Sequence, residues 1–377
     1  LLFPFTNAVS QRIREVGNVI YEDVPEIAQE IKERLRQYQN PRSAYFVDWI
    51  PNDEGILIST RFGNTSQLHT VASPGASRNQ ISFFNEPVRS ASFCPSPEYN
   101  GFFFSKDIGG NEFSQVFWYD LDTRNREMIS DGESVNYGGG WSNKGDRVTF
   151  TSTRRNKKDF YIYISEMSSP KEATLLIDKG AGMWSANEWS PDDQKFIVAQ
   201  RISSTKSNAF IYNLVNKELT QINDEQDESV FFPLSWNSDG DKIYVITNKG
   251  MEFNTLALYD IKTGDLDFIT DKIPWNVDGF DMNKSKTKVA FTVNDNGFNQ
   301  LYLMNTETNM YEKIPNLPIG QIGSISFHPS KDKLAVNLNT TETPGDVYVI
   351  DLGTYEKIRW TYSEVGRLNT SVFPKPQ

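Results

Sequence analysis

The feature that most limits how this chain can fold is a short pattern that recurs at intervals of 44 to 48 residues. In each copy an apolar, usually aromatic residue precedes a polar turn and then a strand-like run, as in WSPDDQKFIV from Trp189 to Val198. Asp and Pro favour turns and β-branched residues favour strands, so each copy predicts a β-hairpin. The residues that precede the turns, called the anchors below, are Trp49, Phe93, Trp141, Trp189, Trp236, Met282 and Phe327.

Two more strand-like segments follow each hairpin. The first is rich in β-branched and aromatic residues, as in LALYDI (256–261), and the second is a short outer segment such as LDFIT (266–270). A fixed period of this length is typical of a β-propeller, in which one repeat forms one four-stranded blade. We therefore expect an all-β fold: a seven-bladed β-propeller of four-stranded antiparallel blades over residues 43–362. The anchors are expected to pack between blades rather than to bind a ligand.

Residues on either side of the repeats are expected to lie outside the propeller. An N-terminal extension, residues 1–42, contains Ile27, Ile31 and Leu35 at four-residue spacing, which predicts a short helix over about residues 24–38. Residues 363–377 are expected to form an exit segment that leads toward a C-terminal domain. The stretch LLFPFTNAV at the start is too short, and lacks the positive flank, of a signal peptide.

The terminal repeats indicate how the ring closes. Residues 44–83 and residues 322–360 each contain four candidate strands, so no strand is left to complete a blade begun by the other end of the chain. We therefore expect blades one and seven to meet through side-chain packing alone. The alternative is that EVGNVIY (15–21) pairs with an outer edge and clasps the ring.

Composition argues against several classes of function. A net charge of −11 argues against a nucleic-acid partner, because such proteins concentrate Lys and Arg on one face. No apolar run approaches 18 residues, so we expect a soluble protein without a membrane-spanning helix. Cys94 is the only cysteine, which leaves no intrachain disulfide and no thiolate metal cage. The compartment stays open between cytoplasmic and periplasmic or secreted.

The residues suggest no catalytic centre of their own. No G-x-S-x-G motif is present, and the histidines, His69 and His328, both occupy blade-repeat positions, which favours structural roles. NSDGD (237–241) lacks the closing Glu of a calcium loop and matches the hairpin turn of the other repeats. We therefore expect no catalytic residue, no metal site and no cofactor in this chain.

Three arginines are candidate substrate-binding residues. Arg154 and Arg155 lie between the second and third strands of repeat three, and Arg61 occupies the equivalent connection of repeat one. A solvated loop is the simpler interpretation. The functional alternative is that these guanidinium groups pair with a peptide carboxylate at the rim of the propeller.

Three stretches resemble a known family. The runs QYQNPRSAYFVDWIPNDEGILISTRFGNTSQLHTV (37–71) and ISFFNEPV (81–88) look like the start of the propeller in bacterial members of the prolyl oligopeptidase family, on the acylaminoacyl-peptidase-like branch. The ending WTYSEVGRLNTSVF (360–373) resembles the segment that leaves the last blade in those enzymes. The repeat motif itself is shared with TolB-type propellers.

The resemblance implies a regulatory role. In that family of serine peptidases the propeller precedes an α/β-hydrolase domain with a Ser–Asp–His triad and restricts access to it. We therefore expect this chain to be a fragment or processed product that stops at Gln377, where the hydrolase domain would begin, with that domain and a peptide substrate as partners. No catalytic residue can be transferred to it, and the adjacent Glu-Glu pair of dipeptidyl-peptidase relatives is absent. The alternative is a free-standing TolB-like propeller that binds a protein partner.

Overall fold

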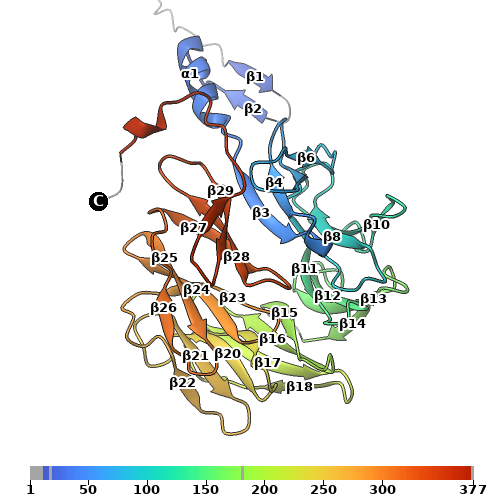
Figure 1. Ribbon diagram of the computed structural model, residues 1–377. Helices are drawn as coiled ribbons and strands as arrows, with labels where there is room; N and C mark the ends of the chain where they lie inside the picture. The colour runs from blue at the N-terminus through green and yellow to red at the C-terminus, as the bar shows by residue number, and fades with distance from the viewer. Residues whose placement is uncertain (1–11, 17–18, 180–181, 375–377) are drawn as a thin grey trace, which may run out of the picture.

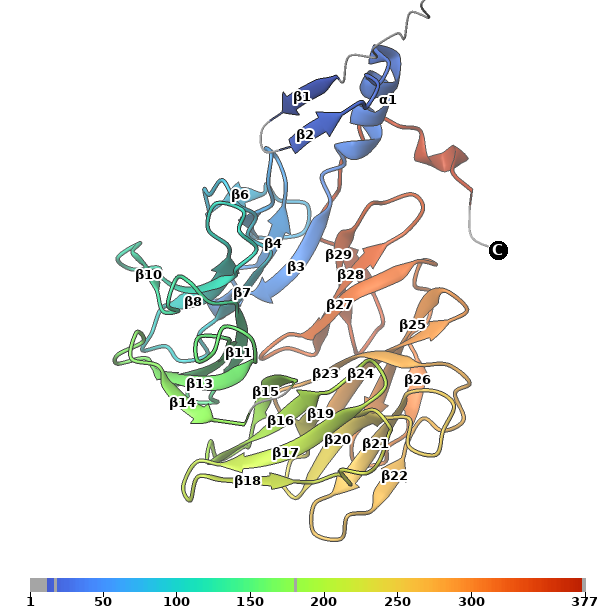
Figure 2. The same cartoon turned by 180° about the vertical axis from the view of Figure 1, so that it is seen from behind.

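The predicted seven-bladed propeller is confirmed. The computed structural model describes residues 12–16, 19–179 and 182–374, and these form seven four-stranded antiparallel sheets in a ring, with a hairpin and a helix beside the first sheet (Figures 1 and 2). In every sheet the strands follow chain order, and the first strands of most neighbouring sheets contact each other. The first strand of each blade therefore lies nearest the axis.

The strand bounds follow the repeats closely. Blade one contains β3 (Ala44–Trp49), β4 (Ile56–Thr60), β5 (Gln67–Val71) and β6 (Asn79–Gln80), with the short 3-10 turn η1 (Pro51–Asp53) after β3. Blade two contains β7 (Ser90–Phe93), β8 (Gly101–Lys106), β9 (Gln115–Asp120) and β10 (Arg126–Met128). Blade three contains β11 (Asn136–Trp141), β12 (Arg147–Ser152), β13 (Tyr161–Glu166) and β14 (Thr174–Ile177). Blade four contains β15 (Met183–Trp189), β16 (Lys195–Arg201), β17 (Ser207–Asn213) and β18 (Glu218–Gln221).

The last three blades have the same organisation. Blade five contains β19 (Phe231–Trp236), β20 (Lys242–Thr247), β21 (Thr255–Asp260) and β22 (Leu266–Phe268). Blade six contains β23 (Val277–Met282), β24 (Lys288–Asp295), β25 (Phe298–Asn305) and β26 (Tyr311–Lys313). Blade seven contains β27 (Gln321–Phe327), β28 (Lys333–Asn339), β29 (Asp346–Asp351) and β30 (Lys357–Arg359).

Each anchor is the last residue of the inner strand of its blade. Its side chain packs against the neighbouring sheet: Trp189 of blade four, for example, joins a buried cluster with Ile162 and Ile164 of blade three. Trp49, Trp189, Trp236 and Phe327 are buried, whereas Phe93, Trp141 and Met282 are half-buried. The anchors thus fill the space between blades, where burial of aromatic area favours association of the sheets.

A repeated hydrogen bond accompanies this packing. The indole Nε1–H groups of Trp49, Trp189 and Trp236 each donate to a backbone carbonyl of the preceding blade, from the residue just before that blade's anchor. The accepting carbonyls are those of Ser326 at 3.3 Å, Gly140 at 3.1 Å and Glu188 at 3.4 Å, respectively. Because Ser326 belongs to blade seven, the joint that closes the ring uses the same bond as two interior joints.

The N-terminal extension forms its own small unit. β1 (Ile13–Val16) pairs with β2 (Val19–Glu22), so the alternative that residues 15–21 clasp an outer blade edge is wrong for the described part of that segment. Helix α1 (Gln29–Gln39) begins five residues later than the predicted start at about residue 24 and ends at residue 39. Residues 24–28, which include Pro25, lie outside the helix. Of the proposed segments, residues 1–11 and 17–18 of the extension and residues 375–377 of the exit segment lie outside the described residues.

The ring closes without strand exchange, as expected, because blades one and seven each contain four strands of their own. The expectation that they meet through side-chain packing alone is wrong. The backbone N–H of Ala44 donates to the carbonyl of Gly345 at 3.0 Å, and that of Gly75 donates to the carbonyl of Trp360 at 3.0 Å. Backbone hydrogen bonds are directional, so they fix the alignment of the two blades as well as their contact.

Candidate functional site

The three candidate arginines lie on the same face of the propeller. Strands alternate in direction, so the loops 61–66 and 153–160, which join second to third strands, lie at the end of the blades where residues 40–43 lead into β3 and residues 361–364 leave β30. We call this the terminal face, because α1 and the exit segment both lie beside it (Figure 1). Arg61, Arg154 and Arg155 are therefore on one face, although blade two separates Arg61 from the other two.

Arg61 lines a cavity of about 560 Å³ on the terminal face. Its Nη2 donates to the carbonyl of Gln39, at the end of α1, at 2.6 Å. Other parts of the wall come from the ends of β3 and β4 at the terminal face, from Ser66, and from Arg89, which directly precedes β7. Arg89 was not among the candidates from sequence, because it lies in a linker between repeats and outside any repeated position.

Arg154 points into its own blade. Its guanidinium lies over the rings of Phe150, at 5.0 Å, and Tyr163, at 4.6 Å, an arrangement that favours the cation. Burial lowers the pKa of Arg154 from its ordinary value. Within the described residues its Nη2 is buried without a hydrogen-bond partner. Most of this side chain is therefore occupied by packing.

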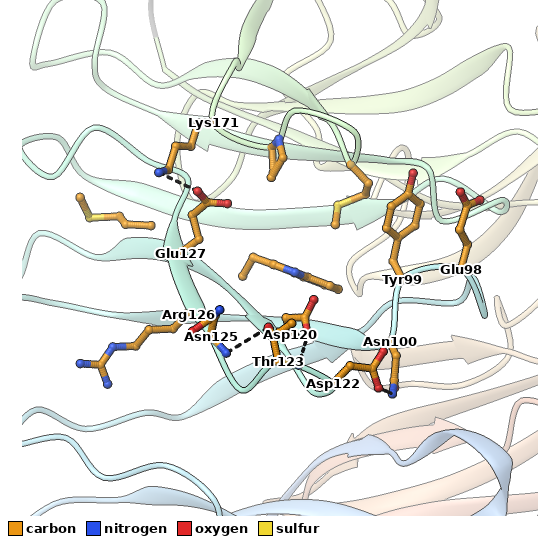
Figure 3. A pocket seen from close by; sticks show the side chains of 14 residues that line it. Glu98, Tyr99, Asn100, Asp120, Asp122, Thr123, Asn125, Arg126, Glu127 and Lys171 are labelled. Atoms are coloured by element: carbon orange, nitrogen blue, oxygen red, sulfur yellow. Dashed lines mark hydrogen bonds and ion pairs between the residues drawn. The ribbon is translucent and has the colours of Figure 1, made fainter.

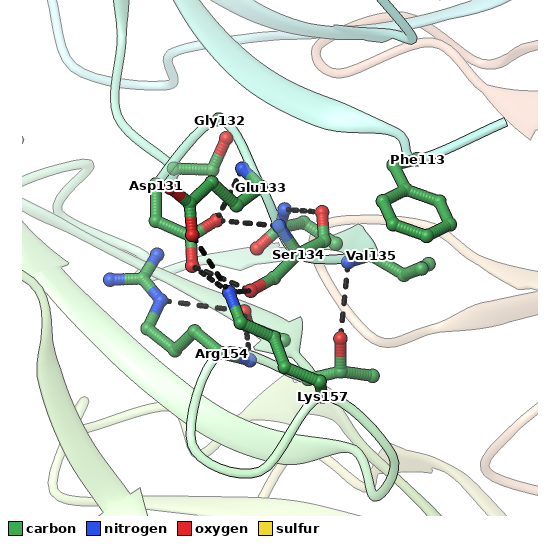
Figure 4. A network of polar contacts seen from close by, with 12 residues as sticks. Phe113, Asp131, Gly132, Glu133, Ser134, Val135, Arg154 and Lys157 are labelled. Carbon is green, nitrogen blue, oxygen red and sulfur yellow. Dashed lines mark hydrogen bonds and ion pairs between the residues drawn. The ribbon is translucent and has the colours of Figure 1, made fainter. Parts of the chain in front are cut away.

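The loop that carries Arg154 is tied to the linker between blades two and three (Figure 4). Lys157 Nζ lies 3.2 Å from Glu133 Oε2 and 3.1 Å from Ser134 Oγ. Arg155 is more exposed, and its Nε pairs with Asp178 Oδ1 at 2.7 Å. Residues 155–158 are exposed, in agreement with the solvated loop predicted as the simpler interpretation, and Arg155 and Lys157 pair with acidic side chains of the same protein.

A second cavity, of about 700 Å³, lies on the opposite face between blades two and three (Figure 3). Its rim is acidic, but several of the carboxylates take part in local structure. Asp122 Oδ1 accepts a hydrogen bond from Asn100 Nδ2 at 2.7 Å, and Glu127 pairs with Lys171 at 2.6 Å. These contacts stabilise the turns that form the rim.

Carboxylates at the ends of the inner strands connect neighbouring blades. Asp48 precedes the anchor of blade one, and its Oδ2 accepts the backbone N–H of Phe93, the anchor of blade two, at 2.8 Å. Asp281 accepts the N–H of Phe327 at 2.6 Å in the same way. Burial raises the pKa of Asp48 to about 7 and that of Asp281 to about 6, against the opposing effect of these hydrogen bonds.

A third carboxylate at the end of an inner strand, that of Glu188, forms an ion pair with a lysine. Its Oε2 accepts the N–H of Trp236 at 2.9 Å, while its Oε1 pairs with Lys286 Nζ at 2.5 Å. Lys286 comes from blade six and also donates to Ser235 Oγ of blade five at 2.9 Å. One lysine therefore connects blades four, five and six close to the axis.

The raised pKa values of Asp48 and Asp281 predict how the stability of the fold depends on pH. Because the pKa of Asp48 is higher in the folded protein than in the unfolded chain, its stabilising contribution is complete below its ordinary pKa and is lost as pH rises through about 7. We therefore expect Asp48→Asn to gain stability relative to the unchanged protein between about pH 4 and about pH 8. Asp281→Asn should behave alike, with the change beginning near pH 4 and nearly complete once the pH has passed about 6. Urea unfolding across this range measures the difference.

The control for this prediction is Asp351→Asn. The backbone N–H of Thr354 lowers the pKa of Asp351, so its contribution is present above its ordinary pKa and is lost only as pH falls below it. Its stability relative to the unchanged protein should stay constant over the upper part of the range. A constant difference for Asp48→Asn as well would contradict the raised pKa.

The interface between blades one and seven is polar at the terminal face. Asp346, at the start of β29, is fully buried and accepts hydrogen bonds from Arg359 at 2.5 Å and from Thr361 Oγ1 at 2.7 Å. Arg78 of blade one lies 3.9 Å from the same carboxylate and donates to the carbonyl of Arg42 at 2.7 Å. Burial lowers the pKa of Arg78, and Asp346 opposes this effect. This cluster links the two blades and was not found from sequence.

A second polar link crosses the same interface at the opposite face. Asp53, in the turn after β3, lies 3.0 Å from His328 Nε2 and 2.8 Å from Lys331 Nζ of blade seven. The imidazole also contacts the Trp49 ring, with centroids 4.6 Å apart. Burial lowers the pKa of His328, which favours its neutral form. His328 thus has a structural role at ring closure.

The described residues contain no group of three or more His, Cys, Asp or Glu side chains placed to hold a metal ion. The other histidine, His69, is buried in β5 with its Nδ1 2.9 Å from the carbonyl of Gln67. Cys94 is also buried, and its thiol donates to the carbonyl of Gly145 at 3.3 Å. No helix in the part of the chain described is long and apolar enough to cross a membrane.

Comparison with known families assigns the fold. Residues 79–361 match the family model of the prolyl oligopeptidase N-terminal beta-propeller domain, which covers well over half of the chain. The chain belongs to this family. The match spans the blades from the outer strand of blade one to the end of blade seven, so it agrees with the resemblance found in the sequence.

Two solved peptidase structures share the architecture of this propeller domain. A chain from a structural and mechanistic analysis of two prolyl endopeptidases has a TM-score of 0.72 at 11% identity, over 98% of this chain and 61% of its own. Prolyl oligopeptidase B from Galerina marginata has a TM-score of 0.68 at 13% identity, over 91% of this chain and 54% of its own. TolB from Acinetobacter baumannii has a TM-score of 0.48 at 15% identity, over 74% of this chain and 66% of its own.

At these identities the likeness to the two peptidase structures shows the fold alone. The propeller chain spans 61% and 54% of their lengths. No curated protein matches its sequence.

Proposed function

We propose that this propeller domain controls which peptides reach the α/β-hydrolase domain of a serine peptidase. Membership of the family supports the link to such a peptidase. The related study of two prolyl endopeptidases assigns inter-domain dynamics a role in their catalysis and specificity. By analogy, the propeller would act on access and selection, and the hydrolase domain would supply the chemistry.

The observation that carries the proposal is the arrangement of the chain on the terminal face. Helix α1 and the exit segment lie together there, joined by a hydrogen bond from Gln37 Nε2 to the carbonyl of Gly366 at 2.7 Å. The backbone N–H of Arg42 donates to the carbonyl of Glu364 at 2.9 Å. A domain that continued from the exit segment would start beside this face and would cover the inner strand ends. A peptide that approached through the ring would then pass the terminal face.

Apolar side chains beside this face support a domain contact. Ile13 and Ile20 of the hairpin are 59% and 61% exposed, and Ile27, which precedes α1, and Ile31 of α1 are 52% and 49% exposed. Exposed apolar residues concentrated on one small part of a chain, here the N-terminal extension, are typical of a surface that another part of a protein covers. We propose that the hydrolase domain covers them. On the same proposal Arg61, Arg154 and Arg155 are candidate contacts of the peptide.

The first test is the activity of this chain alone. We expect no hydrolysis of aminoacyl or acyl-peptide chromogenic substrates by the purified chain, because a hydroxyl without an oriented base and oxyanion donors is not activated. The longer gene product with its downstream domain should hydrolyse them. Activity that co-purifies with this chain and is abolished by a serine-directed phosphonate would contradict the division of roles.

The second arm of the test concerns selection. The longer protein should cleave a short flexible peptide but leave the same sequence uncut within a folded carrier protein, because a folded carrier cannot pass a ring of blades. Equal cleavage of both would show that the propeller does not restrict access. A downstream domain without peptidase activity would overturn the proposed function as a whole.

A further inference from the structure

The cavity on the terminal face contains two arginines without an acidic partner. Arg61 and Arg89 both line it, and among the described residues neither forms an ion pair with a carboxylate. Arg89 is exposed, and the hydrogen bond of Arg61 goes to a backbone carbonyl. Unpaired guanidinium groups are notable in a chain with a net charge of −11. They create a local positive potential in a concave site.

Nearby acidic residues are already engaged elsewhere. Glu364 pairs with Arg42 at 3.1 Å, and Glu86 pairs with Lys106 at 3.0 Å. Glu86 also accepts the backbone N–H of Gly109 at 2.7 Å, which, together with Lys106, lowers its pKa from the ordinary value. These carboxylates therefore have partners of their own, and the two cavity arginines are left to the solvent or to a ligand.

The walls of the cavity suit a peptide end. The Arg61 guanidinium is positioned by its bond to Gln39, so part of the cost of ordering it is met before a ligand binds. Tyr45 of the inner strand β3 also lines the cavity, and this residue is 51% exposed, so its ring is available for apolar contact. The hydroxyls of Ser59 and Thr60 donate to the carbonyls of Val88 and Ser43, which makes the floor rigid.

We propose that Arg61 and Arg89 form a binding site for a peptide carboxylate in the cavity on the terminal face of the propeller. Guanidinium groups bind carboxylates through parallel, charge-assisted hydrogen bonds. The carboxylate is either the C-terminus of the peptide or an acidic side chain. This inference rests on the proposed function, because it names the chemistry by which the terminal face selects peptides.

Calorimetric titration of this chain with matched peptides tests the site. The probes are acetyl-Ala-Ala-Pro-Phe as the free acid, the same peptide as its C-terminal amide, and the amide with Asp in place of the second Ala. We expect the neutral amide to bind at least about tenfold more weakly than one of the two carboxylate peptides. The carboxylate peptide that binds identifies the source of the carboxylate. Its affinity should fall as salt is raised.

Substitutions locate the site. Arg61→Gln and Arg89→Gln should each weaken the bound carboxylate peptide about tenfold, toward the affinity of the neutral amide. Arg124→Gln is the matched control, because Arg124 is also exposed but lies in a turn on the opposite face, and it should leave binding unchanged. Thermal melting of the three variants checks that each is folded.

Contrary outcomes separate this inference from the proposed function. Equal binding of the free acid and both amides, or no binding of any probe, would overturn the carboxylate site. Selective cleavage by the longer protein would still support the proposed function in that case. Equal weakening by Arg124→Gln would show general electrostatic attraction and would also overturn the site.

Discussion

Trp189→Ala should lower the free energy of unfolding by about 3–5 kcal/mol, as truncation of a buried aromatic side chain commonly does. The indole is 3% exposed, and its Nε1 donates to Gly140 of blade three at 3.1 Å. The Arg147 guanidinium lies 4.9 Å from its ring centre. The substitution therefore leaves a cavity between two blades and removes one of the two side-chain hydrogen bonds that the Gly140 carbonyl accepts, the other coming from Thr149 Oγ1. Urea unfolding measures the loss.

Trp189→Phe is the matched control, because it keeps an aromatic ring in the joint and removes the indole hydrogen bond together with part of the packing. We expect it to cost about 1 kcal/mol from the hydrogen bond, plus a small packing term. A loss below about 1 kcal/mol for Trp189→Ala would contradict a role for this residue in the joint between blades. Peptide binding to either folded variant should match that of the unchanged chain.

Asp346→Ala should lower the free energy of unfolding by about 3–5 kcal/mol, because removal of one partner leaves buried charge without compensation. Asp346 is fully buried, whereas the side chains of Arg359 and Arg78 are 27% and 10% exposed. Two cations would then face each other at the interface that closes the ring. Hydrogen exchange should show increased opening of β3 and β29, and denaturant unfolding measures the total loss.

The exposed pair at the same interface provides the comparison. Arg42 and Glu364 lie 3.1 Å apart with side chains 40% and 65% exposed, so Glu364→Gln should cost less than about 1 kcal/mol. Equal effects of Asp346→Ala and Glu364→Gln would show that burial of the Asp346 cluster does not determine its importance.

Local sequence patterns were sufficient to predict the blades. A turn followed by a β-branched run specifies a hairpin through contacts between close neighbours. The segments expected at 256–261 and 266–270 form β21 (Thr255–Asp260) and β22 (Leu266–Phe268). The helix start was less predictable. Ile27 has the right spacing, but Pro25 and its neighbours stay outside the helix, and local signals rarely define helix ends within a few residues.

The closing interface could not be predicted in the same way. Asp346 and Arg78 are far apart in the chain, and neither occupies a position that recurs among the repeats. Residue type alone does not show which charged side chains the fold will bury together. Similarly, the inner strands β3, β15 and β27 each contain a register shift, which depends on how the strand bends around the axis.

The candidate site was predicted in part. Arg61 was found because it occupies the same connection as Arg154, yet the structure turns one toward a cavity and packs the other over aromatic rings. Arg89 gave no signal, because linkers between blades do not repeat. Its proximity to Arg61 arises only when the end of blade one and the start of blade two are brought together.

Closure without strand exchange has a consequence for how the chain could be rearranged. Every sheet is complete within one continuous segment, and the residues that lead into blade one and out of blade seven are hydrogen-bonded neighbours, Arg42 and Glu364. Joining those points and cutting a linker between any other two blades would produce a circular permutant with all seven sheets intact. Each blade is formed by four consecutive strands, whatever its position in the chain. Whole blades are therefore the natural units of duplication, deletion and exchange in a protein of this design.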